Sequence, residues 1–251
     1  MPKIIEIALT LPEGQRLHQN MGSVLHGALM ESARPDFAAA MHKAGVRPFS
    51  QFVYFNKPAM QALWRIAALN DSTAEELDYA LAKIPQNLYL KQKGYVVQLS
   101  KPQLVKQISY ADLAQQFFTM PQVPRKAEIT FVSPASFKAY GSYKIYPDNA
   151  YIFRSLLARW NIYSEGLLLQ EENIEQHLAE AVKVTGYNLS LQQYSVGGAP
   201  IDAFKGRYSL FFKGTDAQNR ISALLLSYAE YAGIGIKPAL GMGGVFVKFL
   251  P

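Results

Sequence analysis

The order of the elements expected from this sequence predicts an α+β fold made of two tandem ferredoxin-like domains. Strand and helix patterns follow one another as β-α-β-β-α-β in the first half, and roughly as β-β-α-β-β-α-β in the second. Two prolines, Pro121 and Pro124, interrupt the periodicity between the halves. We therefore predict an N-terminal domain at residues 1–120, a linker at 121–126 and a C-terminal domain at 127–251.

The first half contains alternating or aromatic-rich runs, which predict strands at 3–10, 49–55, 60–68, 87–91 and 94–108. Apolar residues at helical spacing predict helices at 22–33, at 36–43, after Ser72 and at 111–118. Pro35 separates the first two helices. Ser72 is the expected N-cap of the third helix, because Glu75 three residues later completes a capping-box pattern.

The second half repeats these patterns. Strands are expected from about 127, and at 143–146, 186–195, 206–213 and 245–247. Helices are expected at 149–163 and 170–182, and a final helix carries apolar residues at near-helical spacing, namely Ile221, Leu224, Leu225, Tyr228 and Ala232.

A glycine-rich stretch joins the final helix to the terminal strand. Residues 233–244 hold five glycines and one lysine, Lys237. Glycine permits positive φ and a close approach of the backbone to a ligand, and a turn of exposed N–H groups can bind an anion. A nucleotide-binding P-loop runs from strand to helix, whereas this stretch runs from helix to strand. The alternative is a tight connection that begins with a glycine C-cap.

Composition limits the function classes. The chain has 251 residues, and 49% of them are hydrophobic, which is enough for a sizeable core. A net charge of +6 favours polyanionic partners, and the absence of cysteine excludes disulfides and zinc–thiolate sites. No signal peptide or membrane span of ~20 apolar residues is expected, so we predict a soluble cytoplasmic protein.

Three landmarks together resemble the repeat-processing endoribonucleases of CRISPR systems, the sixth numbered CRISPR-associated family. The Gly-x-Gly-x5-Gly-x-Gly pattern at 233–243 resembles the glycine-rich loop of that family. Residues 22–30, 40–42 and 47–50 resemble its first helix and following strand, and residues 131–138 resemble its central Ser/Thr-Pro-x-Ser-Phe segment. The details look closest to members that accompany type III-A systems.

This resemblance implies a fold and an activity. The fold is a tandem ferredoxin-like (RRM-like) pair, and the activity is metal-independent cleavage of CRISPR repeat RNA within precursor transcripts, part of antiviral defence. In that family the ribose 2′-OH attacks the adjacent phosphate and leaves a 2′,3′-cyclic phosphate and a 5′-OH. The resemblance implies that no cofactor is needed. The implied partners are repeat RNA and other CRISPR-associated proteins, and the implied state of the chain is a monomer or a homodimer.

The reaction needs a base, an acid and a cation, and histidine suits the first two because its ordinary pKa lies near neutrality. The resemblance places the catalytic histidine at His42, whose alternative role is to stabilise a helix C-terminus. Met30 stands where the family often has a tyrosine. His26, one turn earlier, either replaces that tyrosine or is a partly buried structural residue. Arg47 or Lys43 supplies the cation, or both are ordinary surface charges.

For RNA binding we predict the glycine loop and nearby cations, namely Gly233, Gly235, Gly241, Gly243, Lys237 and Lys138. Phe137 either stacks on a base or belongs to the core. Arg154 and Arg159 either line a basic stripe or form a solvated face.

Two other functions remain open from the sequence. A non-catalytic RNA-binding subunit of a CRISPR effector complex would keep the glycine loop and need no histidine. An unrelated ferredoxin-like small-molecule enzyme or regulatory module is the second alternative, but the sequence contains no metal-ligand spacing or nucleophile motif that supports it.

Overall fold

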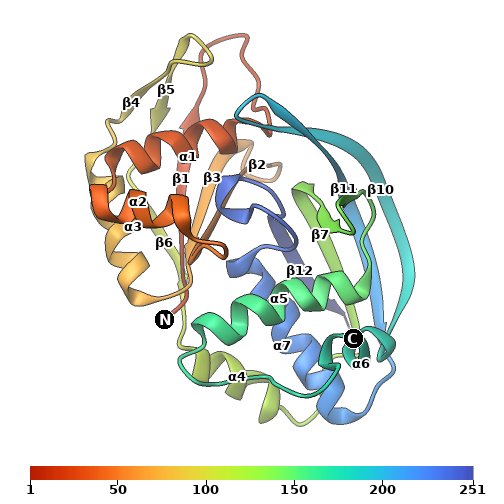
Figure 1. Cartoon of the computed structure of the whole chain (residues 1–251). Coiled ribbons are helices and arrows are strands. Elements are labelled where there is room, and N and C mark those ends of the chain that lie inside the picture. Colours follow the sequence, from red (N-terminus) through yellow and green to blue (C-terminus); the bar gives the residue numbers. More distant parts are fainter. Residues whose placement is uncertain (251) are drawn as a thin grey trace.

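The computed structural model describes residues 1–250, and the chain folds around two antiparallel β-sheets (Figure 1). The first sheet has the order β2-β3-β1-β5-β4, and β6 also pairs with β1. Its strands are β1 (Lys3–Thr10), β2 (Phe49–Asn56), β3 (Gln61–Ala68), β4 (Asn87–Leu90), β5 (Tyr95–Leu99) and β6 (Gln103–Gln107).

Strand alternation gives the first sheet its core face. In β1, Ile5, Ile7 and Leu9 are buried, and Ile5 and Ile7 lie opposite Ile66 and Trp64 of β3. These residues share one core cluster with apolar side chains of the helices, which are α1 (Met21–Ser32), α2 (Pro35–Lys43) and α3 (Asp71–Lys83).

The second sheet has the order β10-β11-β7-β12. Its strands are β7 (Lys126–Ala135), β10 (Val182–Val196), β11 (Ala199–Phe212) and β12 (Val245–Leu250). A small separate hairpin, β8 (Phe137–Ala139) and β9 (Ser142–Lys144), follows β7. The helices are α4 (Tyr110–Phe118), α5 (Asn149–Tyr163), α6 (Ile174–Glu180) and α7 (Asp216–Ala232).

The two sheets share one topology. In each, the first strand of the unit lies between the third and the last strands, and the second strand lies at the edge beside the third. In the first sheet the last position beside β1 is shared by β5 and β6. This arrangement, with helices connecting the strands, is the ferredoxin-like topology, so the predicted fold class is confirmed.

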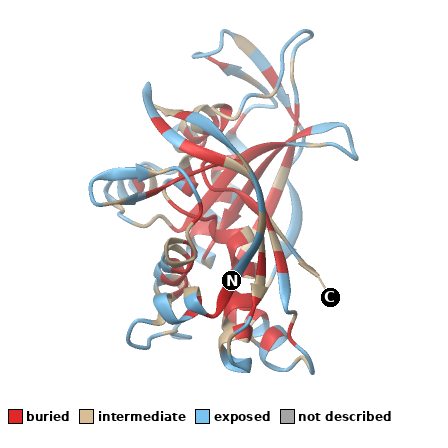
Figure 2. Ribbon diagram, turned by 90° about the vertical axis from the view of Figure 1, so that its right-hand side faces the viewer, coloured by how far each residue is buried: buried red, intermediate tan, exposed pale blue. Residues whose placement is uncertain are grey.

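The halves are joined by extensive packing. Phe52, Tyr54 and Leu63 of the first sheet form a cluster with Val132 and Phe246 of the second. Figure 2 shows buried residues running through the centre of the molecule, while much of the outer strand surface is exposed.

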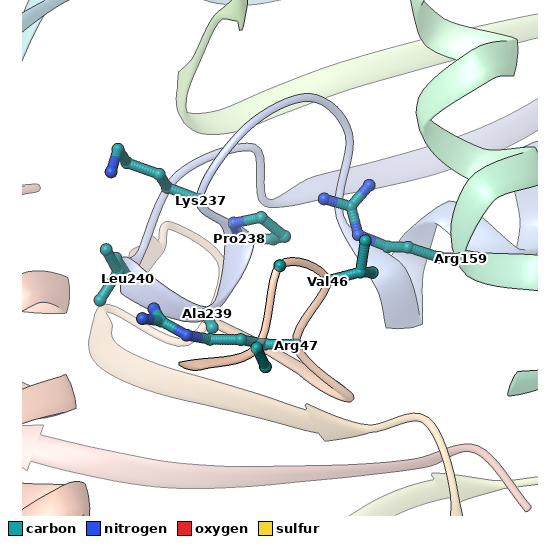
Figure 3. Close-up of a pocket in the computed structure, with 9 residues that line it drawn as sticks. Val46, Arg47, Arg159, Lys237, Pro238, Ala239 and Leu240 are labelled. Atoms are coloured by element: carbon teal, nitrogen blue, oxygen red, sulfur yellow. The ribbon is translucent and has the colours of Figure 1, made fainter. Parts of the chain in front are cut away.

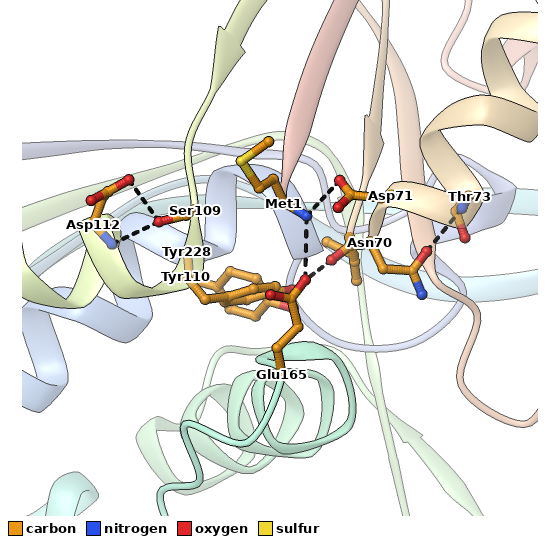
Figure 4. Close-up of polar contacts among 10 residues, drawn as sticks. Met1, Asn70, Asp71, Thr73, Ser109, Tyr110, Asp112, Glu165 and Tyr228 are labelled. Atoms are coloured by element: carbon orange, nitrogen blue, oxygen red, sulfur yellow. Dashed lines mark hydrogen bonds and ion pairs between the residues drawn. The ribbon is translucent and has the colours of Figure 1, made fainter.

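Helix α4 packs on α7 even though it lies in the first 120 residues of the chain. The buried Tyr110 hydroxyl donates to the Leu69 carbonyl at 2.9 Å and lies 3.3 Å from the Tyr228 hydroxyl (Figure 4). In the same view the Met1 ammonium pairs with Asp71 at 2.8 Å and with Glu165 at 3.5 Å. The boundary at 121–126 therefore lies beside a shared core, and the division into domains stays a prediction.

One helix start differs from the sequence prediction. Helix α3 begins at Asp71, and its N-cap is Asn70, whose side chain accepts from the Thr73 N–H at 2.9 Å. The prediction of Ser72 as the cap was wrong, because asparagine two residues earlier supplies an equally good acceptor.

Two strand predictions also change. The expected strand at 94–108 is divided into β5 and β6 at Pro102, which has no N–H to donate to the ladder. The expected strands at 186–195 and 206–213 are parts of one longer hairpin, β10–β11, which turns at Gly197 and Gly198, both with positive φ. Among residues 1–250, no helix is both long and apolar enough to cross a membrane.

Candidate active site

The glycine loop lies against the interior of the molecule. Helix α7 ends at Ala232, and Gly233 continues the chain with φ of 69°. The Ile234 N–H donates to the Gly243 carbonyl at 2.9 Å, which closes the base of the loop. A short 3₁₀ turn, η1 (Pro238–Leu240), forms its tip next to the exposed Lys237.

Four glycines allow this loop to pack. A Cβ built at Gly235 would lie 2.3 Å from the Ser136 carbonyl oxygen, and one at Gly243 would lie 2.0 Å from that of Ile234. At Gly241 it would lie 2.2 Å from the Tyr194 hydroxyl, and at Gly233 2.8 Å from the Pro238 Cβ. All four have positive φ and are buried. Their observed contacts are with protein, so their part in RNA binding stays a prediction.

The loop gathers the sequence landmarks that lie far apart in the chain. The Gly243 N–H donates to the Pro134 carbonyl at 2.9 Å, and the Ile236 N–H donates to the Ser136 carbonyl at 3.0 Å. On the other side, Gly22 of α1 approaches Gly241 so closely that a Cβ on Gly22 would lie 3.0 Å from the Gly241 Cα. The α1 start, the 133–137 segment and the glycine loop thus form one structural unit.

A buried glutamine fixes this unit. The Gln51 side chain is fully buried in β2, and its Nε2 donates to the carbonyls of Gly22 at 2.8 Å and Ala239 at 3.1 Å. Its Oε1 accepts from the Trp64 indole N–H at 2.8 Å. Gln51 therefore holds the tip of the loop against α1, a role that the sequence analysis missed.

A cationic pocket of about 210 Å³ lies where the two halves meet. Figure 3 shows three cations drawn around it from separate elements: Arg47 before β2, Arg159 on α5 and Lys237 in the glycine loop. The residues that line it include no acid, and none of the three cations forms an ion pair within residues 1–250. Three uncompensated cations around one cavity favour an anionic ligand.

Arg159 is buried, and its two terminal nitrogens donate to backbone carbonyls. Nη1 donates to Ser155 and Nη2 to Gly235, each at 2.8 Å. Burial lowers the pKa of this guanidinium from its usual value. The sequence analysis left two alternative roles open for Arg159. Its position indicated burial, because it lies three residues after Leu156 and beside Trp160, on the apolar stripe of α5. A charge on such a stripe indicates a buried functional or structural group.

His26 is buried beneath this pocket. Its ring stacks on Phe49 with centroids 5.9 Å apart, and its Nδ1 is buried without a hydrogen-bond partner within residues 1–250. Burial chiefly lowers its pKa to about 4, with further lowering from Arg47 and His42 and an opposing effect of the Ala239 backbone. His26 is therefore a neutral imidazole near pH 7.

His42 and Arg47 border the same region. His42 is exposed in the last turn of α2, two residues before the pocket lining begins at Ala44. The Arg47 Nε donates to the Met41 carbonyl at 2.8 Å. This bond ties the segment after α2 to the last turn of that helix. Because both His42 and Arg47 affect the pKa of His26, the three predicted catalytic residues lie together. Their catalytic roles stay predictions.

A second cavity of about 200 Å³ adjoins the first, because Val46 and Arg159 line both. Lys138 and Arg154 lie on its lining, and Arg154 is also 3.6 Å from Glu175. Phe137 is only 4% exposed and packs with Phe204, so it belongs to the core. We call the linings of these two adjoining cavities together the basic groove, and define it by Arg47, Arg159, Lys237, Lys138 and Arg154.

The lowered pKa of His26 predicts an acid-sensitive contribution to stability. The unfolded chain binds this proton near pH 6.5 and the folded chain only near pH 4, so the contribution is present above pH 6.5 and is lost as pH falls toward 4. One pKa unit corresponds to about 1.4 kcal/mol, so about 3 kcal/mol is at stake. Urea unfolding at pH 7 and pH 4.5 should show a smaller loss in His26→Leu than in the wild type. Equal losses in the two proteins would remove His26 as the source.

No group of three or more His, Asp or Glu side chains in residues 1–250 is arranged to hold a metal ion. The residues of the groove offer nitrogen donors in place of carboxylates, and such donors suit phosphate oxygens better than a divalent cation.

Fold and groove together define a class: tandem ferredoxin-like proteins whose domains enclose a site for a polyanion. Comparison with known proteins finds similarity to one family. The profile described as CRISPR-associated endoribonuclease Cas6 matches residues 129–245. A protein of that description from Mycobacterium tuberculosis is 27% identical over 233 residues, covering 91% of this chain and 72% of the relative. One from Streptococcus thermophilus is 28% identical over 227 residues, covering 90% and 91%.

A solved structure has the same fold as this chain. The product complex of a Thermus thermophilus Cas6 superposes with a TM-score of 0.77 at 22% identity, covering 99% of this chain and 100% of the other. These comparisons show that the chain is similar to the Cas6 family of CRISPR-associated endoribonucleases.

Proposed function

We propose that this chain is an endoribonuclease that binds CRISPR repeat RNA in precursor transcripts and cuts it to give mature guide RNA. The observation that carries the proposal is an exposed histidine, His42, two residues before the lining of a pocket whose three cations have no acidic partner within residues 1–250. The relatives' description as endoribonucleases supports the same activity.

The proposed chemistry uses the ribose 2′-OH as the nucleophile. His42 exchanges a proton with the attacking or the leaving oxygen, and its exposure lets RNA reach the ring. Arg47, which lines the pocket, stabilises the negative charge that develops on the phosphate. The reaction leaves a 2′,3′-cyclic phosphate and a 5′-OH and requires no metal ion.

His26 has a supporting part in this proposal. Being neutral and buried near pH 7, it has no proton to donate as an imidazolium. Its stacking on Phe49 and its position near Ala239 hold α1 against the wall of the pocket. The burial favours the structural alternative for His26 over replacement of the family's tyrosine.

The groove orients the RNA through its phosphates. Arg47, Arg159 and Lys237 surround the first cavity, and Lys138 extends the positive surface to the second. Phosphate contacts of this kind give affinity and position without reading sequence. We further propose a cytoplasmic location, other CRISPR-associated proteins of a type III-A system as partners, and a monomer or homodimer.

A labelled repeat RNA incubated with the protein in excess EDTA tests this function. We expect one discrete cut per repeat, with a rate that EDTA leaves unchanged. Binding without cutting would instead support the non-catalytic subunit. If the RNA is neither bound nor cut, the chain is an unrelated ferredoxin-like enzyme or module. Either of these two outcomes would overturn the proposal.

A further inference from the structure

The β8–β9 hairpin is separate from both large sheets. It lies in the segment that joins β7 to α5 (green in Figure 1), and its two strands pair only with each other. The four-stranded core topology of the second domain is complete without it. Its most prominent side chain is Tyr140 at the tip, which is 96% exposed.

This hairpin combines aromatic rings with positive charge. Residues 137–147 contain two lysines, Lys138 and Lys144, and no acidic residue. Besides Tyr140, Tyr143 is 39% and Tyr146 57% exposed. A large exposed aromatic surface is uncommon on a free protein surface and usually marks a binding site. The lysines give this surface the charge that complements a nucleic acid.

The backbone of the hairpin has a regular ladder and a tight turn. Tyr140 and Gly141 both have positive φ, 51° and 77°, as a tight two-residue hairpin turn requires. Lys138 lies directly opposite Tyr143 in the ladder, so both side chains project from the same face. At the base, the buried Ser136 hydroxyl donates to the Lys144 carbonyl at 3.1 Å. The ordered backbone reduces the conformational entropy that is lost when a ligand binds.

The hairpin is continuous with the basic groove. Lys138 lines the second cavity, and Ser136, at the foot of the hairpin, accepts a hydrogen bond from Ile236 in the glycine loop. Tyr140 lies two positions after Lys138, a distance of roughly 7 Å along a strand. An extended RNA that leaves the cavity beside Lys138 therefore meets the tyrosines within about one nucleotide's length.

We infer that the β8–β9 hairpin is a stacking platform for single-stranded RNA that flanks the part held in the groove. Tyr140 and Tyr143 stack on unpaired bases, and Lys138 and Lys144 contact the intervening phosphates. Stacking on aromatic rings is tolerant of sequence, because every base presents a π-face. The platform thus extends the RNA footprint beyond the cleaved repeat, and this inference rests on the proposed function.

Binding experiments with three RNAs test the platform. One is the repeat alone, and the others carry eight-nucleotide uridine tails at the 5′ or the 3′ end, with 2-aminopurine in the tail as a reporter. We expect one tailed RNA to bind the wild-type protein more tightly than the bare repeat and to show quenched fluorescence. In Tyr140→Ala/Tyr143→Ala, the affinity for that RNA should fall about tenfold or more, with quenching lost and affinity for the bare repeat kept.

Two further variants make this result specific. Tyr140→Phe/Tyr143→Phe keeps the rings and should keep both affinity and quenching. Tyr89→Ala removes a tyrosine that is 56% exposed on β4, outside the hairpin, and should bind both RNAs normally. Thermal unfolding of each variant shows that its fold is retained.

Several outcomes would overturn the inference. The first is that the double alanine variant and the wild type bind every tailed RNA with equal affinity. The second is that the variant loses the same affinity for tailed and for bare RNA. The third is that the variant loses binding to a CRISPR-associated protein while its RNA affinity is unchanged. The last would make the hairpin a protein-binding surface. These results are independent of cleavage: a wild type that binds tails through the hairpin but never cuts would refute the proposed activity and leave the platform intact.

Discussion

His42→Ala should slow cleavage of repeat RNA by about 10²–10⁴-fold while leaving its affinity nearly unchanged, because a positioned acid or base typically contributes that factor. The ring is exposed at the end of α2, so its removal leaves no cavity in the core. Single-turnover rates with enzyme in excess are required, since slow product release would mask the chemical step.

A matched control is available for this result. His177 is exposed on α6, 3.5 Å from Glu171 and away from the groove lining, so His177→Ala should cut at the wild-type rate. Full-speed cutting by His42→Ala would show that another group moves the proton. A loss of RNA affinity as large as the loss of rate would make His42 a binding residue.

Gly235→Ala should strongly destabilise the fold. The added Cβ would lie 2.3 Å from the Ser136 carbonyl oxygen, and φ is +87°. A left-handed conformation costs a non-glycine residue about 1–2 kcal/mol, and overpacking costs about 1–3 kcal/mol more. Together these terms predict a loss of about 2–5 kcal/mol, or a fall in Tm of roughly 5–15 °C for a chain of this size.

Gly27→Ala is the control for this prediction. Gly27 lies within α1, and a Cβ there meets no atom within 4 Å. Alanine is the better helix former by up to about 1 kcal/mol, so Gly27→Ala should unfold at or above the wild-type temperature. If Gly235→Ala unfolds at the wild-type temperature in the same calorimetric experiment, the close contact with Ser136 does not constrain the loop.

The fold was predictable because local signals agreed with the tertiary topology. Alternation in β1, with Ile5, Ile7 and Leu9 buried, and the helical stripe of α7 are strong patterns that packing did not override. The ferredoxin-like class followed from element order alone. At the start of α3, where Asn70 and Ser72 can both cap a helix, the capping-box pattern led to the wrong choice of Ser72.

The site was less predictable, since it depends on contacts between distant segments. His42 and Lys237 were predicted from their motifs, but the pocket is completed by Arg159, more than a hundred residues from Arg47 along the chain. Gln51 was missed entirely, because a glutamine in a strand gives no sign that its amide joins α1 to the glycine loop. The glycine motif predicted close approach to a ligand, and the close contacts in the structure are with backbone and side-chain atoms of the protein itself.

The central claim is that this chain cuts repeat RNA with the ribose 2′-OH as nucleophile. The most direct measurement uses a repeat RNA with a single 2′-deoxyribose at the cleaved position, in EDTA, beside the all-ribose RNA. The proposed mechanism predicts equal binding of the two RNAs, cutting of the all-ribose RNA to a product with a 2′,3′-cyclic phosphate, and no detectable cutting of the deoxy RNA. Cutting of the deoxy RNA at the normal rate would show that water or a protein group attacks the phosphate, and would contradict the mechanism.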